Sequence, residues 1–231
     1  MVRRKSELFV HQETSITDIA RRIAEETGGF TGGNVDLFAA AGKYSFDSLK
    51  KCGLVRTSRV LDYGCGALRL GYRLVRFLDP DRYFGIEPSK KFLDAGIKHA
   101  IGPELMAEKR PRFHCAGDFD FSVFGEKFDF LIARSIFSHA SPEQFLKSMD
   151  SFRDNSAAGG IMLASYRPLR PRDGKADIVD PNPDGRDWRL RRYALSYLQD
   201  RARERGLFAD NFDEPFNGQV WLRLSRRELQ D

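Results

Sequence analysis

The stretch from residue 59 to residue 88 constrains the fold more than any other part of the chain. It contains RVLDYGCGALRLG and, further on, YFGIEP, which predicts a strand, a glycine turn, a helix and a second strand ending in an acid. Such a unit lays a nucleoside across the carboxyl ends of parallel strands, because glycines let the backbone approach and the acid binds ribose hydroxyls. The two strands are expected to end at Asp62 and Glu87.

The spacing of the glycines separates two kinds of nucleotide site. A dinucleotide site of the form G-x-G-x-x-G would have its third glycine at position 69, where this chain has Arg69. The segment from Leu61 to Gly66 instead reads as an apolar strand, Asp, any residue, Gly, any residue, Gly. In this it resembles the class I, Rossmann-like, S-adenosylmethionine-dependent methyltransferases. The chain departs from that family at Leu68, where a further glycine is common, and this leaves the shape of the amino-acid end of the pocket open.

From residue 58 onward the apolar pattern alternates between strands and helices. Strands are predicted at 59–62, 83–87, 112–116, 128–133, 159–165, 207–212 and 219–224. Helices are predicted at 67–78, 89–100, 142–154 and 187–205. This alternation predicts an α/β fold with a doubly wound, mostly parallel seven-stranded sheet. Because no helix separates the final two strands, the last strand is expected to be antiparallel.

The regions outside this alternation predict a domain organisation. Ser15 and Asp18 form a potential capping box before a first helix, and a second helical stretch runs from Val35 toward Gly53. We therefore expect residues 1–57 to be a helical N-terminal extension or lid, and residues 58–231 to be the Rossmann-like domain. Within that domain, residues 167–187 contain four prolines and many charges. They are interpreted as a substrate-side loop, with a surface insertion as the alternative.

Charge and apolar patterning narrow the possible partners. The net charge of +5 arises from 38 basic residues interspersed with 33 acidic ones, which favours a mixed solvated surface over a nucleic-acid face. No apolar run approaches the length of a membrane span, and the basic start is not followed by an apolar signal core. We expect a cytoplasmic protein, a monomer or a homodimer, without a membrane partner. The cysteines at 52, 65 and 115 are too far apart to indicate zinc or a disulfide framework, so no metal is expected.

The family resemblance implies S-adenosylmethionine as cofactor and assigns residues to it. Asp62 matches the acid that contacts the methionine ammonium, and Glu87 matches the acid that receives the ribose hydroxyls. Asp118 and Phe119 match the positions that contact the adenine, although Asp120 competes for that role. The full implied set is Asp62, Gly64, Cys65, Gly66, Glu87, Pro88, Asp118, Phe119, Ala133 and Arg134, the last two through their backbones. The alternatives are that Asp62 caps the helix, that Glu87 is a surface acid and that Asp118 belongs to an ordinary turn.

Under the same mapping, His139 is the histidine expected at the catalytic edge of the sheet. A near-neutral imidazole can take the proton of an acceptor hydroxyl as its oxygen attacks the methyl carbon. The alternative is that His139 merely hydrogen-bonds the loop that caps the next helix. The residues expected to contact the acceptor are Tyr44, Tyr166, Arg167 and Trp188, with a surface role as the alternative for Tyr166 and Arg167.

The resemblance implies methyl transfer to an acceptor by in-line displacement. Aromatic residues in the extension and loop favour O-methylation of a small molecule, such as a sugar or a secondary metabolite. Arginines around Trp188 keep an RNA methyltransferase open as an alternative, and a protein methyltransferase is a related one. The departure at Leu68 leaves a third alternative, a cofactor-binding protein that no longer transfers methyl groups. A nucleic-acid partner would be distinguished by affinity that falls steeply with salt.

Overall fold

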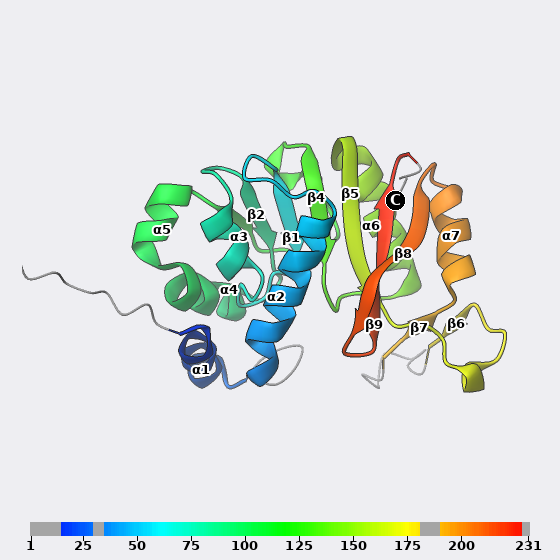
Figure 1. The fold of residues 1–231 in the computed structure, drawn as a ribbon, viewed down its shortest axis with the longest axis horizontal. Coiled ribbons are helices and arrows are strands. Elements are labelled where there is room, and N and C mark those ends of the chain that lie inside the picture. Colours follow the sequence, from blue (N-terminus) through cyan, green and yellow to red (C-terminus); the bar gives the residue numbers. More distant parts are fainter. Residues whose placement is uncertain (1–14, 30–34, 181–189, 228–231) are drawn as a thin grey trace, which may run out of the picture.

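A seven-stranded sheet forms the centre of the molecule (Figure 1). The structure is a computed structural model that describes residues 15–29, 35–180 and 190–227. The strands are β1 (Val60–Tyr63), β2 (Tyr83–Ile86), β3 (Arg112–His114), β4 (Phe128–Ala133), β5 (Ser156–Tyr166), β8 (Phe208–Phe216) and β9 (Gln219–Ser225). They lie in the order β3-β2-β1-β4-β5-β9-β8, and β9 is antiparallel to both of its neighbours. The predicted fold class is therefore confirmed.

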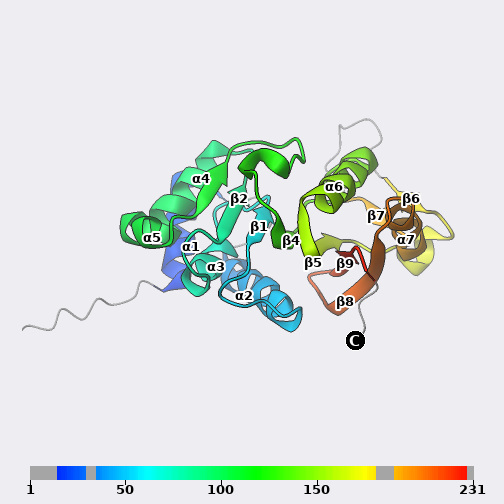
Figure 2. The same cartoon turned by 90° about the horizontal axis from the view of Figure 1, so that it is seen from above.

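The alternation of side chains along each strand builds one hydrophobic core on each face of the sheet. Leu61 and Tyr63 belong to one core and Val60 to the other. Helices α6 (Pro142–Asn155) and α7 (Leu195–Arg203) contribute to the first core. The second is covered by α1 (Ile16–Thr27), α2 (Asp36–Lys51), α3 (Gly71–Phe77) and α4 (Lys90–Gly96). Seen from above, α2 and α3 lie on the opposite side of the sheet from α6 (Figure 2).

Two predicted helices begin later than the sequence indicated. Helix α3 begins at Gly71 rather than at 67, because the chain first loops through Leu68, whose φ is +60°. Helix α7 begins at Leu195 rather than at 187. The described residues before it include a short strand, β7 (Arg192–Tyr193), which pairs with β6 (Ile178–Val179).

The helix predicted at 89–100 is also divided. After α4 ends at Gly96 the chain forms one wide turn, η1 (Ile97–Ile101), and then a further helix, α5 (Gly102–Lys109), which the sequence did not reveal. Gly96 packs against the loop that follows β1, since a Cβ there would lie 2.7 Å from the carbonyl carbon of Ala67. The end of α4 therefore packs directly against the glycine loop and helps to fix its position.

The two N-terminal helices share a core with the rest of the chain. As predicted, the Ser15 side chain caps α1 by accepting a hydrogen bond from the Asp18 amide. Helix α2 approaches the loop after β1 so closely that a Cβ on Gly42 would lie 2.4 Å from the carbonyl oxygen of Arg69. Its Ser48 hydroxyl also accepts a hydrogen bond from the Trp221 indole (2.9 Å). Helix α2 therefore borders the space next to the loop after β1.

Part of the segment 167–187 lies within the described residues. It contains a short helical turn, η3 (Pro171–Asp173), and strand β6. The segment is fastened to the loop after β4 by Arg191, whose guanidinium pairs with Asp180 (2.7 Å) and donates to the His139 carbonyl (2.6 Å). Of the described helices, none combines the length and apolar character needed to cross a bilayer.

Candidate active site

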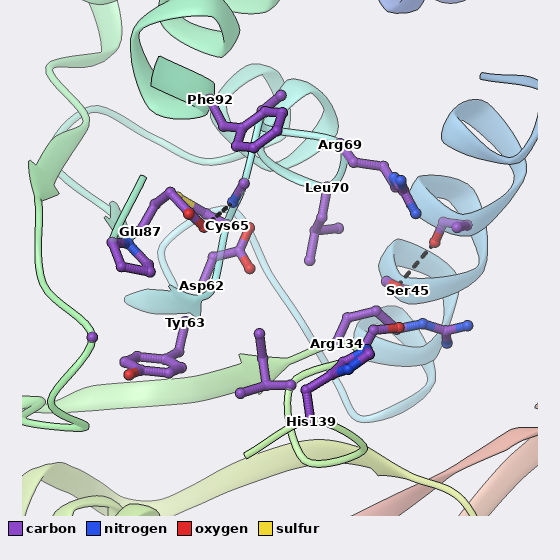
Figure 3. Close-up of a pocket in the computed structure, with 18 of the residues that line it drawn as sticks. Ser45, Asp62, Tyr63, Cys65, Arg69, Leu70, Glu87, Phe92, Arg134 and His139 are labelled. Atoms are coloured by element: carbon purple, nitrogen blue, oxygen red, sulfur yellow. Dashed lines mark hydrogen bonds between the residues drawn. The ribbon is translucent and has the colours of Figure 1, made fainter. Parts of the chain in front are cut away.

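A pocket of about 430 Å³ opens at the carboxyl ends of β1, β2 and β4. The chain order reverses between β1 and β4, and ligands of open α/β sheets bind at such switch points. Side chains from α2 close the pocket on one side, and the loop after β4 closes it below (Figure 3). Most of the residues expected at the cofactor line it, namely Asp62, Gly64, Cys65, Gly66, Glu87, Pro88, Phe119 and Arg134.

Asp62, at the end of β1, is 3% exposed and lines the pocket. Its carboxylate accepts one hydrogen bond, from the Tyr83 hydroxyl (2.9 Å). Burial raises the pKa of Asp62 to about 7, the Tyr83 bond opposes this rise, and the charge of Glu87 adds to it. A buried acid with this pKa gains most from a cationic partner, such as a ligand ammonium.

Glu87 follows β2 and is 8% exposed. One carboxylate oxygen accepts from the Gly66 amide and the other from the Ser89 amide, both at 2.9 Å. These bonds fix the plane of the carboxylate and tie the tip of β2 to the glycine loop. Because each carboxylate oxygen can accept about two hydrogen bonds, Glu87 keeps acceptor capacity toward the pocket. The arrangement suits two vicinal hydroxyls.

The two glycines of the loop have different surroundings. Both have positive φ, +70° for Gly64 and +54° for Gly66, which favours glycine. A Cβ on Gly64 would lie 2.2 Å from Cδ1 of Ile136, so this glycine allows the loop after β4 to pack closely. A Cβ on Gly66 would meet no atom within 4 Å. The Gly66 backbone therefore borders open space in the pocket, as a ligand cradle requires.

The segment after β3 differs in part from expectation. Phe119 lines the pocket and is buried, whereas Asp118 is exposed, is not among the lining residues and accepts from the Asp120 amide (3.2 Å). The Phe119 amide, at a position expected to contact the adenine, donates to the Tyr63 hydroxyl oxygen in this structure (3.2 Å). The sequence missed this because Tyr63 reads as an ordinary strand residue. In this structure Gly117 and Phe119 form the pocket wall here.

The loop after β4 is held by buried polar contacts. Ser135 has a φ of +59°, and its amide donates to the Ser165 hydroxyl (2.7 Å). The Gln219 side chain bridges the two serines, donating to the Ser135 hydroxyl (2.8 Å) and accepting from the Ser165 hydroxyl (2.6 Å). Ala133 is fully buried in the core at the end of β4 and does not line the pocket. The network fixes the residues that follow it, which do line the pocket.

His139 lies on this loop at the pocket mouth, exposed to solvent on one side. Partial burial, Arg167 and Arg191 lower its pKa below the ordinary value of 6.5. The imidazole is therefore neutral at pH 7 and able to accept a proton. The His139 backbone carbonyl accepts a hydrogen bond from Arg191, and this bond fixes the loop but not the imidazole ring.

Two arginines line the side of the pocket opposite the acids (Figure 3). Arg69 comes from the loop after β1, and its guanidinium lies over the Phe38 ring (5.5 Å). Arg134 was expected to contribute only its backbone, yet its guanidinium lies over the rings of Tyr44, Phe216 and Trp221 at 4.9–5.2 Å. No periodic signal marks either arginine in the sequence, because each is placed by tertiary packing.

Of the other residues expected near the acceptor, the three that the structure describes, Tyr44, Tyr166 and Arg167, are not among those that line the pocket. Tyr44 stacks on Phe216 (4.8 Å), and its hydroxyl donates to the Glu214 carbonyl (2.6 Å), so it supports Arg134. Tyr166 is fully buried, its hydroxyl donates to Asn211 (2.8 Å), and it is not among the residues that line the pocket. The structure therefore does not bring Tyr166 to the pocket, where it was expected to meet the acceptor. Arg167 lies against the β8–β9 turn at Gly218, and Trp188 lies outside the described residues.

The described cysteines do not alter this description of the pocket. Cys65 is buried in its wall, and burial raises the pKa of its thiol well above the ordinary value. Cys52 and Cys115 are free thiols elsewhere. Among the described residues, no group of His, Cys, Asp and Glu side chains is arranged to hold a metal ion.

Comparison with known proteins identifies the fold. The sequence matches no protein-family model and no curated protein. Solved structures match almost the whole chain. Magnesium protoporphyrin IX methyltransferase from Synechocystis PCC 6803, with bound S-adenosylmethionine, has a TM-score of 0.60 at 15% identity, covering 91% of this chain and 90% of its own. The chain has the class I methyltransferase fold.

Two further class I structures agree over similar lengths. The DhpI complex with S-adenosylhomocysteine has a TM-score of 0.60 at 16% identity, covering 92% of this chain and 98% of its own. The glycopeptide N-methyltransferase MtfA has a TM-score of 0.61 at 14% identity, covering 84% of this chain and 97% of its own. The resemblance first seen in the glycine loop is thus confirmed for the fold.

Proposed function

We propose that the protein is an S-adenosylmethionine-dependent methyltransferase that O-methylates a small molecule. The observation that carries this is the pairing of Asp62 and Glu87, two buried acids from neighbouring strand ends that line one pocket. A sulfonium cofactor with an ammonium and a ribose diol presents the groups that such acids bind. The fold shared with proteins crystallised with this cofactor or its product supports the same assignment.

The residues present fit this cofactor. The open space above Gly66 gives its backbone room to approach a ligand, and Glu87 retains acceptor capacity. Leu68 adopts the positive φ that a glycine would take, so the loop keeps its turn despite the departure from the family pattern. This supports an intact cofactor site, and measured methyl transfer would distinguish an active enzyme from a protein that only binds the cofactor.

The chemistry divides between the cofactor and the chain. When bound, the cofactor would supply an electrophilic methyl group to the acceptor oxygen, and its sulfur would retain the electron pair of the carbon–sulfur bond. Asp62 binds the ammonium, Glu87 binds the ribose hydroxyls, and the loop after β4 places the acceptor. His139 takes the proton that a hydroxyl acceptor releases. Alignment of the reactants supplies the larger part of the acceleration, about 7–11 kcal/mol, so the base is an addition to it.

Glu87→Gln tests the cofactor assignment. The amide keeps one acceptor oxygen but turns an NH₂ group toward an amide donor and loses the charge, so affinity for S-adenosylhomocysteine should fall about tenfold. Isothermal titration of the folded variant measures this. Glu126→Gln removes a similar acid that pairs with Arg59 and Arg112 outside the pocket, and should leave affinity unchanged. Equal affinities in both variants would contradict the site.

His139→Ala tests the proposed base. We expect turnover to fall by about 10²-fold while S-adenosylhomocysteine affinity stays within a small factor of the parent's. In the parent, the turnover rate at saturating cofactor should fall only below pH 6.5, because the lowered pKa of His139 keeps the imidazole neutral above that pH. Transfer of radiolabelled methyl into a cell extract gives the readout. If His139→Ala turns over at the parent's rate, His139 is structural.

The same assay distinguishes the acceptor classes. We expect the label to appear in the low-molecular-weight fraction of the extract. Label in RNA that disappears as salt rises would instead favour a nucleic-acid acceptor, because phosphate contacts are salt-sensitive. Label in protein would favour a protein methyltransferase.

A further inference from the structure

The pocket is divided electrostatically. Asp62 and Glu87 lie on one side, and their hydrogen-bond donors are the Tyr83 hydroxyl and backbone amides rather than arginines. Arg69 and Arg134 lie on the other side, next to helix α2 (Figure 3). The acidic side suits the cationic cofactor proposed above. For the two arginines on the other side, no anionic group has yet been named that would bind them.

Arg134 carries the uncompensated part of this charge. Among the described residues, no carboxylate lies within ion-pairing distance of its guanidinium. Its Nη2 donates a long hydrogen bond to the Phe216 carbonyl (3.3 Å). Burial, with smaller contributions from the charges of Arg69 and Arg167, lowers its pKa to about 10. A partly buried cation near other cations is costly unless a ligand anion completes the arrangement.

The surroundings of Arg134 hold it ready for such an anion. The rings of Tyr44, Phe216 and Trp221 pack around the guanidinium, and Tyr44 stacks on both of the others. Aromatic faces stabilise a guanidinium without using its N–H groups, which form a planar fork suited to an oxyanion. Arg134 also belongs to the loop that carries His139, and so lies on the acceptor side rather than on the glycine loop.

Resting on the proposed methyltransferase function, we propose that the methyl acceptor carries a carboxylate or phosphate group that pairs with Arg134. The group anchors the acceptor at the α2 side of the pocket, while its nucleophilic oxygen faces the transferred methyl group near His139. The same carboxylate chemistry is present in the methionine moiety of the cofactor, so the test must separate these two sources.

Benzoate and its neutral isostere benzamide provide the probe pair. Each is titrated by ligand-observed NMR into the full chain saturated with S-adenosylhomocysteine. We expect the parent to bind benzoate at least about tenfold more tightly than benzamide. Arg134→Met should abolish this preference, and Arg134→Lys should retain part of it, because it keeps the charge but loses the fork. Arg203→Met, which removes an exposed arginine from α7, should behave as the parent does.

A second titration separates the two sources. If Arg134 pairs with the acceptor, Arg134→Met binds S-adenosylhomocysteine within about threefold of the parent. A tenfold loss of that affinity would assign Arg134 to the cofactor and overturn the proposal. Equal binding of benzoate and benzamide by the parent would overturn it as well.

Failure of the proposed function would be seen separately, as a parent that does not bind S-adenosylhomocysteine. The benzoate preference, measured then on the protein alone, would still report whether Arg134 binds an anion. Circular dichroism and a melting curve show whether each variant is folded. If Arg134→Met does not fold, the proposal is tested by comparing the parent with Arg134→Lys. An Arg134→Lys variant that prefers benzoate over benzamide as strongly as the parent does would contradict recognition through the planar guanidinium.

Discussion

Asp62→Asn should make the protein more stable and, at the same time, remove most of its affinity for S-adenosylhomocysteine. The pKa of Asp62 in the folded state, about 7, lies above its ordinary value of 3.8. The ionised carboxylate therefore costs stability, and this cost grows as pH rises from the unfolded pKa to the folded one. Asparagine still accepts from the Tyr83 hydroxyl but carries no charge. We expect a melting temperature on the order of 5 °C higher at pH 8, with a smaller gain at pH 5.

The loss of affinity has the opposite sign because the ligand ammonium needs the charge. A charge-assisted hydrogen bond to a buried acid contributes up to about 3 kcal/mol, so affinity should fall by about 10²-fold. The parent's affinity should also weaken roughly tenfold or more as pH falls from 7.5 to 5.5, when Asp62 becomes protonated. Asp62→Asn should lose that pH dependence. Calorimetry and melting curves at several pH values measure all three effects. A variant that is less stable and binds as well as the parent would show that Asp62 is structural.

The sequence predicted the acids better than it predicted the arginines, for a physical reason. Asp62 and Glu87 each end an apolar strand, and the carboxyl ends of neighbouring parallel strands share one edge of the sheet. Their proximity therefore follows from local pattern and topology. Arg134 also follows a strand, but the direction of its side chain depends on Tyr44, Phe216 and Trp221, which come from distant parts of the chain.

The same distinction accounts for the errors in the fold. The strands that form the centre of the sheet were found within a few residues, because buried strands are continuous apolar runs. The start of α3 was missed because Leu68 gives no sign in the sequence of its positive φ. Tyr166 was assigned to the acceptor because it follows the strand predicted at 159–165. In fact its hydroxyl bonds to Asn211 on β8, a contact across the sheet that local sequence does not reveal.

Gly66→Ala should weaken binding of S-adenosylhomocysteine by roughly 30-fold, which corresponds to about 2 kcal/mol of overpacking in a closely fitting site. The added methyl group meets no protein atom within 4 Å, so it projects into the space that the ligand would occupy. The positive φ adds a cost of about 1 kcal/mol to folding, which should lower the melting temperature by only a few degrees. Calorimetric titration and a melting curve measure the two effects.

Gly64→Ala is the matched control, because it carries the same φ penalty but directs its methyl group at the protein. Its Cβ would lie 2.2 Å from Cδ1 of Ile136, so its main cost should be in stability. Ile136→Val removes that Cδ1, and the double variant should recover part of the lost stability, as a double-mutant cycle would show. Gly66→Ala should gain nothing from Ile136→Val. If Gly66→Ala bound S-adenosylhomocysteine as tightly as the parent, the cofactor would not lie against this loop, and the acids beside it would need another ligand.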